Sequence, residues 1–108
     1  MTDAATTRVA RVWRAAATPD NLPAYVAVFR ELVEPELRSL PGFIGASVVT
    51  APRDGLVDIV VTTRWASRAA IEAFAGADVE RAVIEPEALA VLAEHDTRVR
   101  HFDVALEI

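Results

Sequence analysis

The stretch from Leu56 to Ala75 changes its pattern of apolar residues partway along. Up to Trp65 the residues are mostly β-branched and apolar, whereas beyond Ser67 they are rich in alanine, with apolar side chains at helical spacing. Ser67 is placed to accept from the first free N–H groups of a helix. The pattern therefore predicts a strand that ends at Trp65 and a helix that Ser67 caps.

The same reasoning extends to the rest of the chain. Apolar periodicity predicts the order strand, helix, strand, strand, helix, strand, over residues 8–16, 22–40, 43–50, 56–65, 68–75 and 97–106. This order is that of two βαβ halves joined by a hairpin. We therefore predict an α+β, ferredoxin-like fold, in which a four-stranded antiparallel sheet carries helices on one face.

Prolines and glycines mark the expected interruptions. Pro35 lies within the first helical pattern, where it lacks a backbone donor, so we expect a kink or break near Glu34. Residues 52–55, which end in a glycine, predict the turn of the hairpin. Residues 79–95 predict short helical pieces broken at Pro86.

The third strand is apolar on both faces, which indicates burial on both sides. Because the helices cover one face only, the other is best covered by a second copy of the sheet. We therefore predict a homodimer with a closed, barrel-like core. The chain of 108 residues is expected to be one domain, 1–108, with residues 1–7 as a flexible leader.

Composition narrows the classes of function. There is no cysteine, which excludes disulfides and thiol catalysis. The net charge of −5, without a basic cluster, argues against nucleic acid as a partner. No apolar run approaches the roughly 18 residues of a membrane span, so we expect no membrane insertion. The polar start resembles no secretion signal, so we expect a cytoplasmic protein.

Several short motifs, taken in order, resemble those of one family. They are Leu40-Pro41-Gly42-Phe43 before a strand, Trp65-Ala66-Ser67 at a strand-to-helix junction, Phe74 nine residues beyond the tryptophan, and His101-Phe102-Asp103 in the last strand. Together they resemble the antibiotic biosynthesis monooxygenase (ABM) domain of the dimeric α+β barrel superfamily. The resemblance runs from about Arg8 to Val104.

This resemblance implies a function for the chain. Some members of the family oxygenate polyketide or other aromatic molecules without a cofactor. In that mechanism the protein removes a phenolic proton, and the resulting anion itself reacts with oxygen. A cation or a tryptophan N–H would stabilise the developing negative charge in a closed apolar pocket. We therefore expect cofactor-independent oxygenation of a small aromatic or polyketide-type molecule.

Candidate site residues follow from this expectation. Trp65, Arg64 and His101 are the candidate catalytic residues. The candidate substrate-binding residues are Tyr25, Phe29, Phe74, Trp13 and Arg14. Because side chains alternate along a strand, Arg64 and Trp65 must face opposite sides of the sheet.

Each candidate also has a structural interpretation. The two tryptophans could fill the core, and Tyr25 could be a buried residue with a backbone partner. Arg64 and Arg14 could pair with Asp58 or Asp103. The acidic residues of the C-terminal half are expected on a solvated helical face: Glu80, Glu85, Glu87, Glu94 and Asp96.

Metal and haem chemistry receive little support from the residues. In members of the family that degrade haem, a histidine ligates the iron some nineteen residues after the tryptophan, and Ile84 stands at that position here. Neither His95 nor His101 belongs to a set of ligands at a known metal spacing. We therefore expect no metal and no cofactor.

Two other functions remain open. The chain could be a non-catalytic, ligand-binding or structural dimer that has kept the fold and lost the chemistry. It could also be another dimeric-barrel enzyme, an isomerase or dehydratase, with His101 as its base. His101 and Asp103 share one face of a strand, where a carboxylate could orient the imidazole.

Overall fold

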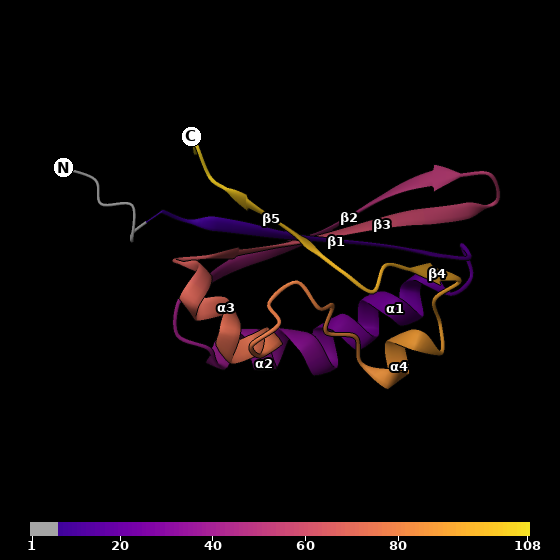
Figure 1. Cartoon of the computed structure of the whole chain (residues 1–108). Coiled ribbons are helices and arrows are strands. Elements are labelled where there is room, and N and C mark those ends of the chain that lie inside the picture. The colour runs from indigo at the N-terminus through magenta and orange to yellow at the C-terminus, as the bar shows by residue number, and fades with distance from the viewer. Residues whose placement is uncertain (1–6) are drawn as a thin grey trace.

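A computed structural model describes residues 7–108, so the predicted leader lies, except for Thr7, outside the described residues. The elements in chain order are β1 Val9–Ala17, α1 Leu22–Val28, the π-helical turn η2 Phe29–Val33, α2 Glu34–Ser39, β2 Phe43–Arg53, β3 Leu56–Trp65, α3 Arg68–Ala75, α4 Pro86–Leu89, β4 Glu94–His95 and β5 Arg100–Asp103. Figure 1 shows the helices together on one face of the sheet, with the other face uncovered. The predicted α+β, ferredoxin-like architecture is confirmed.

The first strand lies at the centre of the antiparallel sheet. β1 pairs with β3 along its whole length, from Val9 opposite Trp65 to Ala17 opposite Val57, and β2 lies beyond β3. On its other side β1 pairs with β4 near its end and with β5 near its beginning. Two short strands thus share the position at which we predicted one strand over residues 97–106.

The first helical region runs without a gap from α1 through η2 to α2. The expected break near Glu34 takes the form of a wide turn, in which the N–H of Glu34 donates to the carbonyl of Phe29. Pro35 follows as one of the first residues of α2. Because a proline lacks the donor that a regular helix would use there, the turn widens and the helix continues.

The hairpin turn is shorter than predicted. Only Asp54 and Gly55 separate β2 from β3, and both have positive φ angles, 48° and 81°. This is the conformation that two-residue hairpins favour. Pro52 belongs to β2 and lies opposite Val57. A proline is tolerated there because β2 is at the edge of the described sheet.

The segment before α4 differs most from expectation. We predicted helical pieces on both sides of Pro86, but residues 79–85 form a turn, an isolated bridge between Arg81 and Arg98, and then a segment without regular structure. The N–H of Ala82 donates to the carbonyl of Thr97 (2.9 Å). Pro86 begins α4 instead of breaking it, because the first helical residue needs no donor.

Two clusters of apolar side chains fill the space between the sheet and the helices. One lies around Tyr25 and Ile59, and the other around Trp65, Leu37 and Ile71. Ser67 caps α3 as predicted, because its hydroxyl accepts from the N–H of Ala70 (3.2 Å). The junction between β3 and α3 is thereby fixed beside the second cluster.

The two faces of the sheet differ in exposure. Along β3, fully buried residues alternate with half-buried ones from Ile59 to Trp65. On the uncovered face, Val49 is 55% exposed and Phe102 is 41% exposed. The described helices are all too short or too polar to cross a membrane.

Candidate functional site

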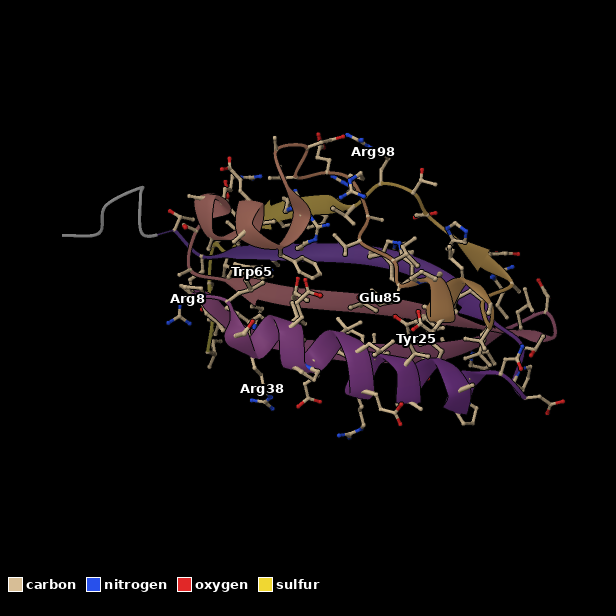
Figure 2. The ribbon with its side chains drawn as sticks, turned by 90° about the horizontal axis from the view of Figure 1, so that it is seen from below. Arg8, Tyr25, Arg38, Trp65, Glu85 and Arg98 are labelled. Atoms are coloured by element: carbon tan, nitrogen blue, oxygen red, sulfur yellow. The ribbon has the colours of Figure 1, made fainter. Side chains whose placement is uncertain are left out.

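A pocket lies between the sheet and the helices. Its lining comes from β1, β3, the helical region from α1 to α2, α3 and the segment around α4, and includes Arg11, Trp13, Tyr25, Val28, Phe29, Val33, Leu37, Val61, Thr63, Phe74, Val83, Ile84, Glu85, Ala88 and Val99. Figure 2, seen from the helix side, labels two of these residues, Tyr25 on α1 and Glu85 just before α4. Apolar groups make up most of the lining.

The free volume of the pocket is small. It measures about 50 Å³, whereas an enclosed apolar cavity that holds benzene measures roughly 150 Å³. Even a single aromatic ring, and all the more a ligand with several fused rings, therefore requires lining side chains to move apart. Residues 79–85 cover one side of the pocket. They contain no helix, and a few hydrogen bonds join them to the rest of the chain.

Arg11 is the charged residue at the floor of the pocket. It points from β1 toward the helices, and only 4% of its surface is exposed. Its guanidinium donates to the carbonyls of Val79 and Arg81, the latter at 2.8 Å. Burial and the neighbouring Arg81 lower the pKa of Arg11 to about 10, so the side chain is still a cation at neutral pH.

His101 lies on β5 directly opposite Arg11. Its Nε2 is 3.1 Å from Nη1 of Arg11. Because a guanidinium only donates, Nε2 must accept and the ring proton must be on Nδ1. Burial, Arg11 and Arg68 lower the pKa of His101, which favours this neutral form. Asp103 accepts from Arg68 (3.2 Å), so the carboxylate that we considered as a partner of His101 is bonded elsewhere.

Aromatic side chains form much of the wall. Trp13, Tyr25, Phe29 and Phe74, four of the predicted substrate-binding residues, all line the pocket. The indole N–H of Trp13 donates to the carbonyl of Asp96 (2.7 Å).

Tyr25 differs from its structural interpretation. The side chain is 4% exposed, and its hydroxyl, which is not fully buried, takes part in no hydrogen bond within residues 7–108. The expected backbone partner is therefore absent from residues 7–108. Burial raises the pKa of Tyr25, so the hydroxyl is neutral and available as a donor inside the pocket.

Trp65 lies behind the pocket wall rather than in its lining. It is fully buried, and its ring packs against Phe43 and Phe74 at centroid distances of 5.4 and 5.8 Å. Its indole N–H donates to the hydroxyl of Thr63 (2.8 Å). This donor is already bonded, and Trp65 contacts the pocket lining at Phe74 and Thr63.

Arg64 and Arg14 lie away from the pocket. Arg14 is exposed on β1, and Arg64 lies half-buried on β3 with its guanidinium against Gly45. Both strand positions alternate with the buried ones, so both residues face the uncovered side of the sheet. Within residues 7–108 neither arginine forms the expected pair with Asp58 or Asp103, because Asp58 pairs with Arg53 (2.8 Å) and Asp103 with Arg68.

Glu85 and Arg11 are functional candidates that the sequence analysis did not select. Glu85 was expected on a solvated helical face, but it lines the pocket and makes no ion pair within residues 7–108. No sequence signal distinguished it from neighbouring acids. Arg11 carried a signal, because it shares a strand face with the apolar Val9 and Trp13. In the described part of the chain, no group of acidic and histidine side chains is placed to hold a metal ion.

Solved structures resemble this chain over nearly its whole length. A conserved protein from Methanosarcina mazei has a TM-score of 0.67 at 15% identity, covering 92% of this chain and 94% of that one. A monooxygenase from the gene ActVA-Orf6 of Streptomyces coelicolor, in complex with nanaomycin D, has a TM-score of 0.61 at 24% identity, covering 98% and 94%. The cofactor-independent oxygenase SnoaB of Streptomyces nogalater has a TM-score of 0.60 at 17% identity, covering 94% and 97%.

At these identities the likeness concerns the fold alone. A comparison with curated proteins gave no match. The family model described as antibiotic biosynthesis monooxygenase, however, matches residues 8–86. This match spans β1 to the start of α4 and includes all of the pocket lining except Ala88 and Val99. The chain therefore belongs to the antibiotic biosynthesis monooxygenase family.

Proposed function

We propose that this protein is a cofactor-independent monooxygenase that acts on a hydroxylated aromatic or polyketide-type molecule. The single observation that carries the proposal is the aromatic-lined pocket with the buried cation Arg11 and the carboxylate of Glu85 in its lining. The fold shared with the cofactor-independent oxygenase of S. nogalater supports it.

The proposed chemistry begins with a proton transfer. A base removes a phenolic proton, or one from the adjacent ring CH₂, and the ring becomes an electron-rich anion. We assign Glu85 as this base, because it is the carboxylate among the pocket-lining residues that the structure describes. Nε2 of His101 is less suited to the task, since its lone pair faces Arg11.

Oxygen then reacts with the anion directly. The carbanion carbon bonds to one atom of O₂ and gives up electrons to it. The O–O bond breaks as the second C–H proton leaves, so a CH₂ group becomes a carbonyl and the other oxygen atom leaves as water. The apolar walls at Trp13, Phe29 and Phe74 would exclude water from the reactive anion.

Oxygen uptake with a hydroxylated anthrone as substrate tests this proposal. We expect consumption of one O₂ per quinone formed, and a fall in kcat of about a hundredfold or more in Glu85→Gln. The matched control is Glu87→Gln, an exposed residue of α4, which should leave kcat unchanged. Absence of oxygen uptake with any hydroxylated anthrone or naphthol would contradict the proposal.

One observation favours a second candidate. The small free volume, about 50 Å³, fits a non-catalytic dimer whose pocket has partly closed. With the pocket closed in this way, the protein would bind no anthrone and would consume no oxygen. Titration with the same anthrone separates the two functions, because only the oxygenase must bind it.

We also propose that the protein is a homodimer joined through the uncovered face of the sheet. The support is the apolar character of that face, where Val49 and Phe102 are both exposed in the single chain. A cytoplasmic location and the absence of a cofactor stay predictions.

A further inference from the structure

Among residues 7–108, the charge of Arg11 has no acidic partner. No carboxylate lies within ion-pair distance of its guanidinium in residues 7–108, although the side chain is only 4% exposed. The arginines that do form ion pairs in this range lie on the surface, such as Arg53 with Asp58 and Arg98 with Asp78. Burying an unpaired cation is costly, and arginines in protein interiors are usually paired.

The neutral partners of Arg11 leave part of its donor capacity unused. Nη1 contacts the carbonyl of Val79 and Nε2 of His101, and Nη2 donates to the carbonyl of Arg81. A guanidinium has five N–H groups. The N–H on Nε and one on Nη2 therefore have no acceptor in the described part of the chain, while the residue lines the pocket.

The surroundings fix the side from which a ligand meets this cation. The guanidinium carbon lies 5.7 Å from the centre of the Phe74 ring. Val79, Arg81 and His101, which contact the other donors of the guanidinium, are not among the lining residues of the pocket. An oxygen anion on a planar ring stacked near Phe74 would reach the remaining N–H groups, which are matched to an oxyanion in geometry and charge.

We propose that Arg11 is the specificity-determining residue of the pocket and binds a single ionised oxygen on a planar, apolar ligand. The ligand is thus selected as a monoanion, because a second negative charge would meet the carboxylate of Glu85 on the same lining. This inference rests on the proposed function in placing the substrate in this pocket. It goes beyond that function in naming the ionisation state that the pocket accepts and the residue that selects it.

A coloured phenol provides the test. Titration of the full chain with para-nitrophenol, followed by the visible absorption of the phenolate, compares binding of the ionised and neutral forms. We expect the ionised form to bind roughly tenfold or more tightly than the neutral form. The neutral analogue para-nitroanisole measures the apolar contribution alone. Equal binding of the two forms, or binding of neither, overturns the inference.

Two variants separate anion binding from a structural role of Arg11. Arg11→Met removes the charge at similar volume, and we expect it to abolish the preference for phenolate while para-nitroanisole binds as before. Arg38→Met is the matched control, since it removes an arginine that points away from the pocket on α2 (Figure 2) and that, within residues 7–108, pairs only with Glu34 at the surface. A folded Arg11→Met protein that still prefers the phenolate overturns the inference, because Arg11 would then only clamp Val79 and Arg81.

Arg11→Lys is a second variant in case Arg11→Met, which loses the hydrogen bonds to the carbonyls of Val79 and Arg81, does not fold. Arg11→Lys keeps a cation at the site and should keep a preference for phenolate, though a weaker one. If neither variant folds, titration of the wild-type chain still tests the inference. The wild-type chain must bind phenolate more tightly than neutral phenol, and equal binding of the two overturns the inference.

Oxygen uptake is a separate measurement. Phenolate selection without oxygen consumption would contradict the oxygenase proposal alone. Oxygenation at equal rates by wild type and Arg11→Met would contradict the role of Arg11 alone.

Discussion

At the scale of single residues, Arg11 and His101 depend on each other. The imidazole can accept from the guanidinium only while it is neutral, and a protonated His101 would place two cations 3.1 Å apart. Glu80 acts in the opposite direction on His101 but is a smaller influence than Arg11 or Arg68. Protonation of His101 would therefore remove a contact that holds Arg11 in place at the pocket floor.

This linkage predicts that stability falls on acidification. The folded chain holds the pKa of His101 below its ordinary value of 6.5, so the unfolded chain binds the proton more readily. The contribution of His101 is complete above about pH 6.5 and is lost as the pH falls toward the folded pKa. We expect the urea midpoint to drop between about pH 7.5 and about pH 5.5, and to drop less in His101→Gln.

The other histidine provides the control for this effect. His95 is exposed on β4, so His95→Gln should keep the wild-type drop in the urea midpoint. An equal drop in wild type and His101→Gln would contradict the linkage between His101 and Arg11.

The sequence predicted the aromatic part of the site better than its charges. Trp13, Tyr25, Phe29 and Phe74 were selected because apolar residues at strand or helix spacing face the core, and they do line the pocket. The alternation of side chains along β1 also predicts that Arg11 points inward. The sequence could not predict its hydrogen-bond partners, because Val79 and Arg81 accept through backbone carbonyls, which every residue has.

At the scale of elements, the start of β2 depends on a glycine. Gly42 has φ +86°, and a Cβ built on it would lie 2.6 Å from Cβ of Ala70 on α3. Its carbonyl also accepts from the N–H of Ala66 (2.8 Å). The close approach of β2 to the junction of β3 and α3 therefore has no room for a side chain.

Two glycine substitutions separate backbone strain from steric overlap. Gly55 has a similar φ, +81°, but a Cβ there would meet nothing within 4 Å. We expect Gly55→Ala to lower the free energy of unfolding by about 1 kcal/mol, from φ alone, and Gly42→Ala to lower it by about 3 kcal/mol. Chemical unfolding of both variants measures the difference, and equal losses would show that α3 moves aside without cost.

Elements were predicted where periodicity is long and missed where it is short. The apolar pattern of β3 extends over ten residues, and the cap at Ser67 depends only on the residues that follow it directly. A local rule was therefore enough to predict both. Residues 79–85 are apolar and acidic as in a helix, yet their hydrogen bonds go to Thr97 and to Arg11. Tertiary partners distant in the sequence decide this segment, and no local pattern records them.

At the scale of the whole molecule, the uncovered face of the sheet leads to a prediction about assembly. We expect light scattering to give about twice the chain mass of 11.7 kDa. Val49→Glu should shift the protein toward monomer, since a carboxylate on this face would be buried without a partner in the dimer.

An exposed apolar residue on the opposite side of the molecule provides the control. Leu89 on α4 is 44% exposed, and Leu89→Glu should leave the mass unchanged. A wild-type chain that scatters as a monomer at high micromolar concentration would contradict the dimer. So would equal dissociation in the two variants.

The pairing of β1 with both β3 and β5 has a consequence for how the protein is made. Val9 lies opposite Asp103, so the central strand pairs with a strand that is made long after it. Contacts between such distant segments close large loops and form slowly. Arg11 and His101 come from these two strands, 90 positions apart in the sequence, and therefore meet only after the segments between them have been made. A nascent chain can carry the hairpin and its first helices before β5 docks and Arg11 gains its contact with His101.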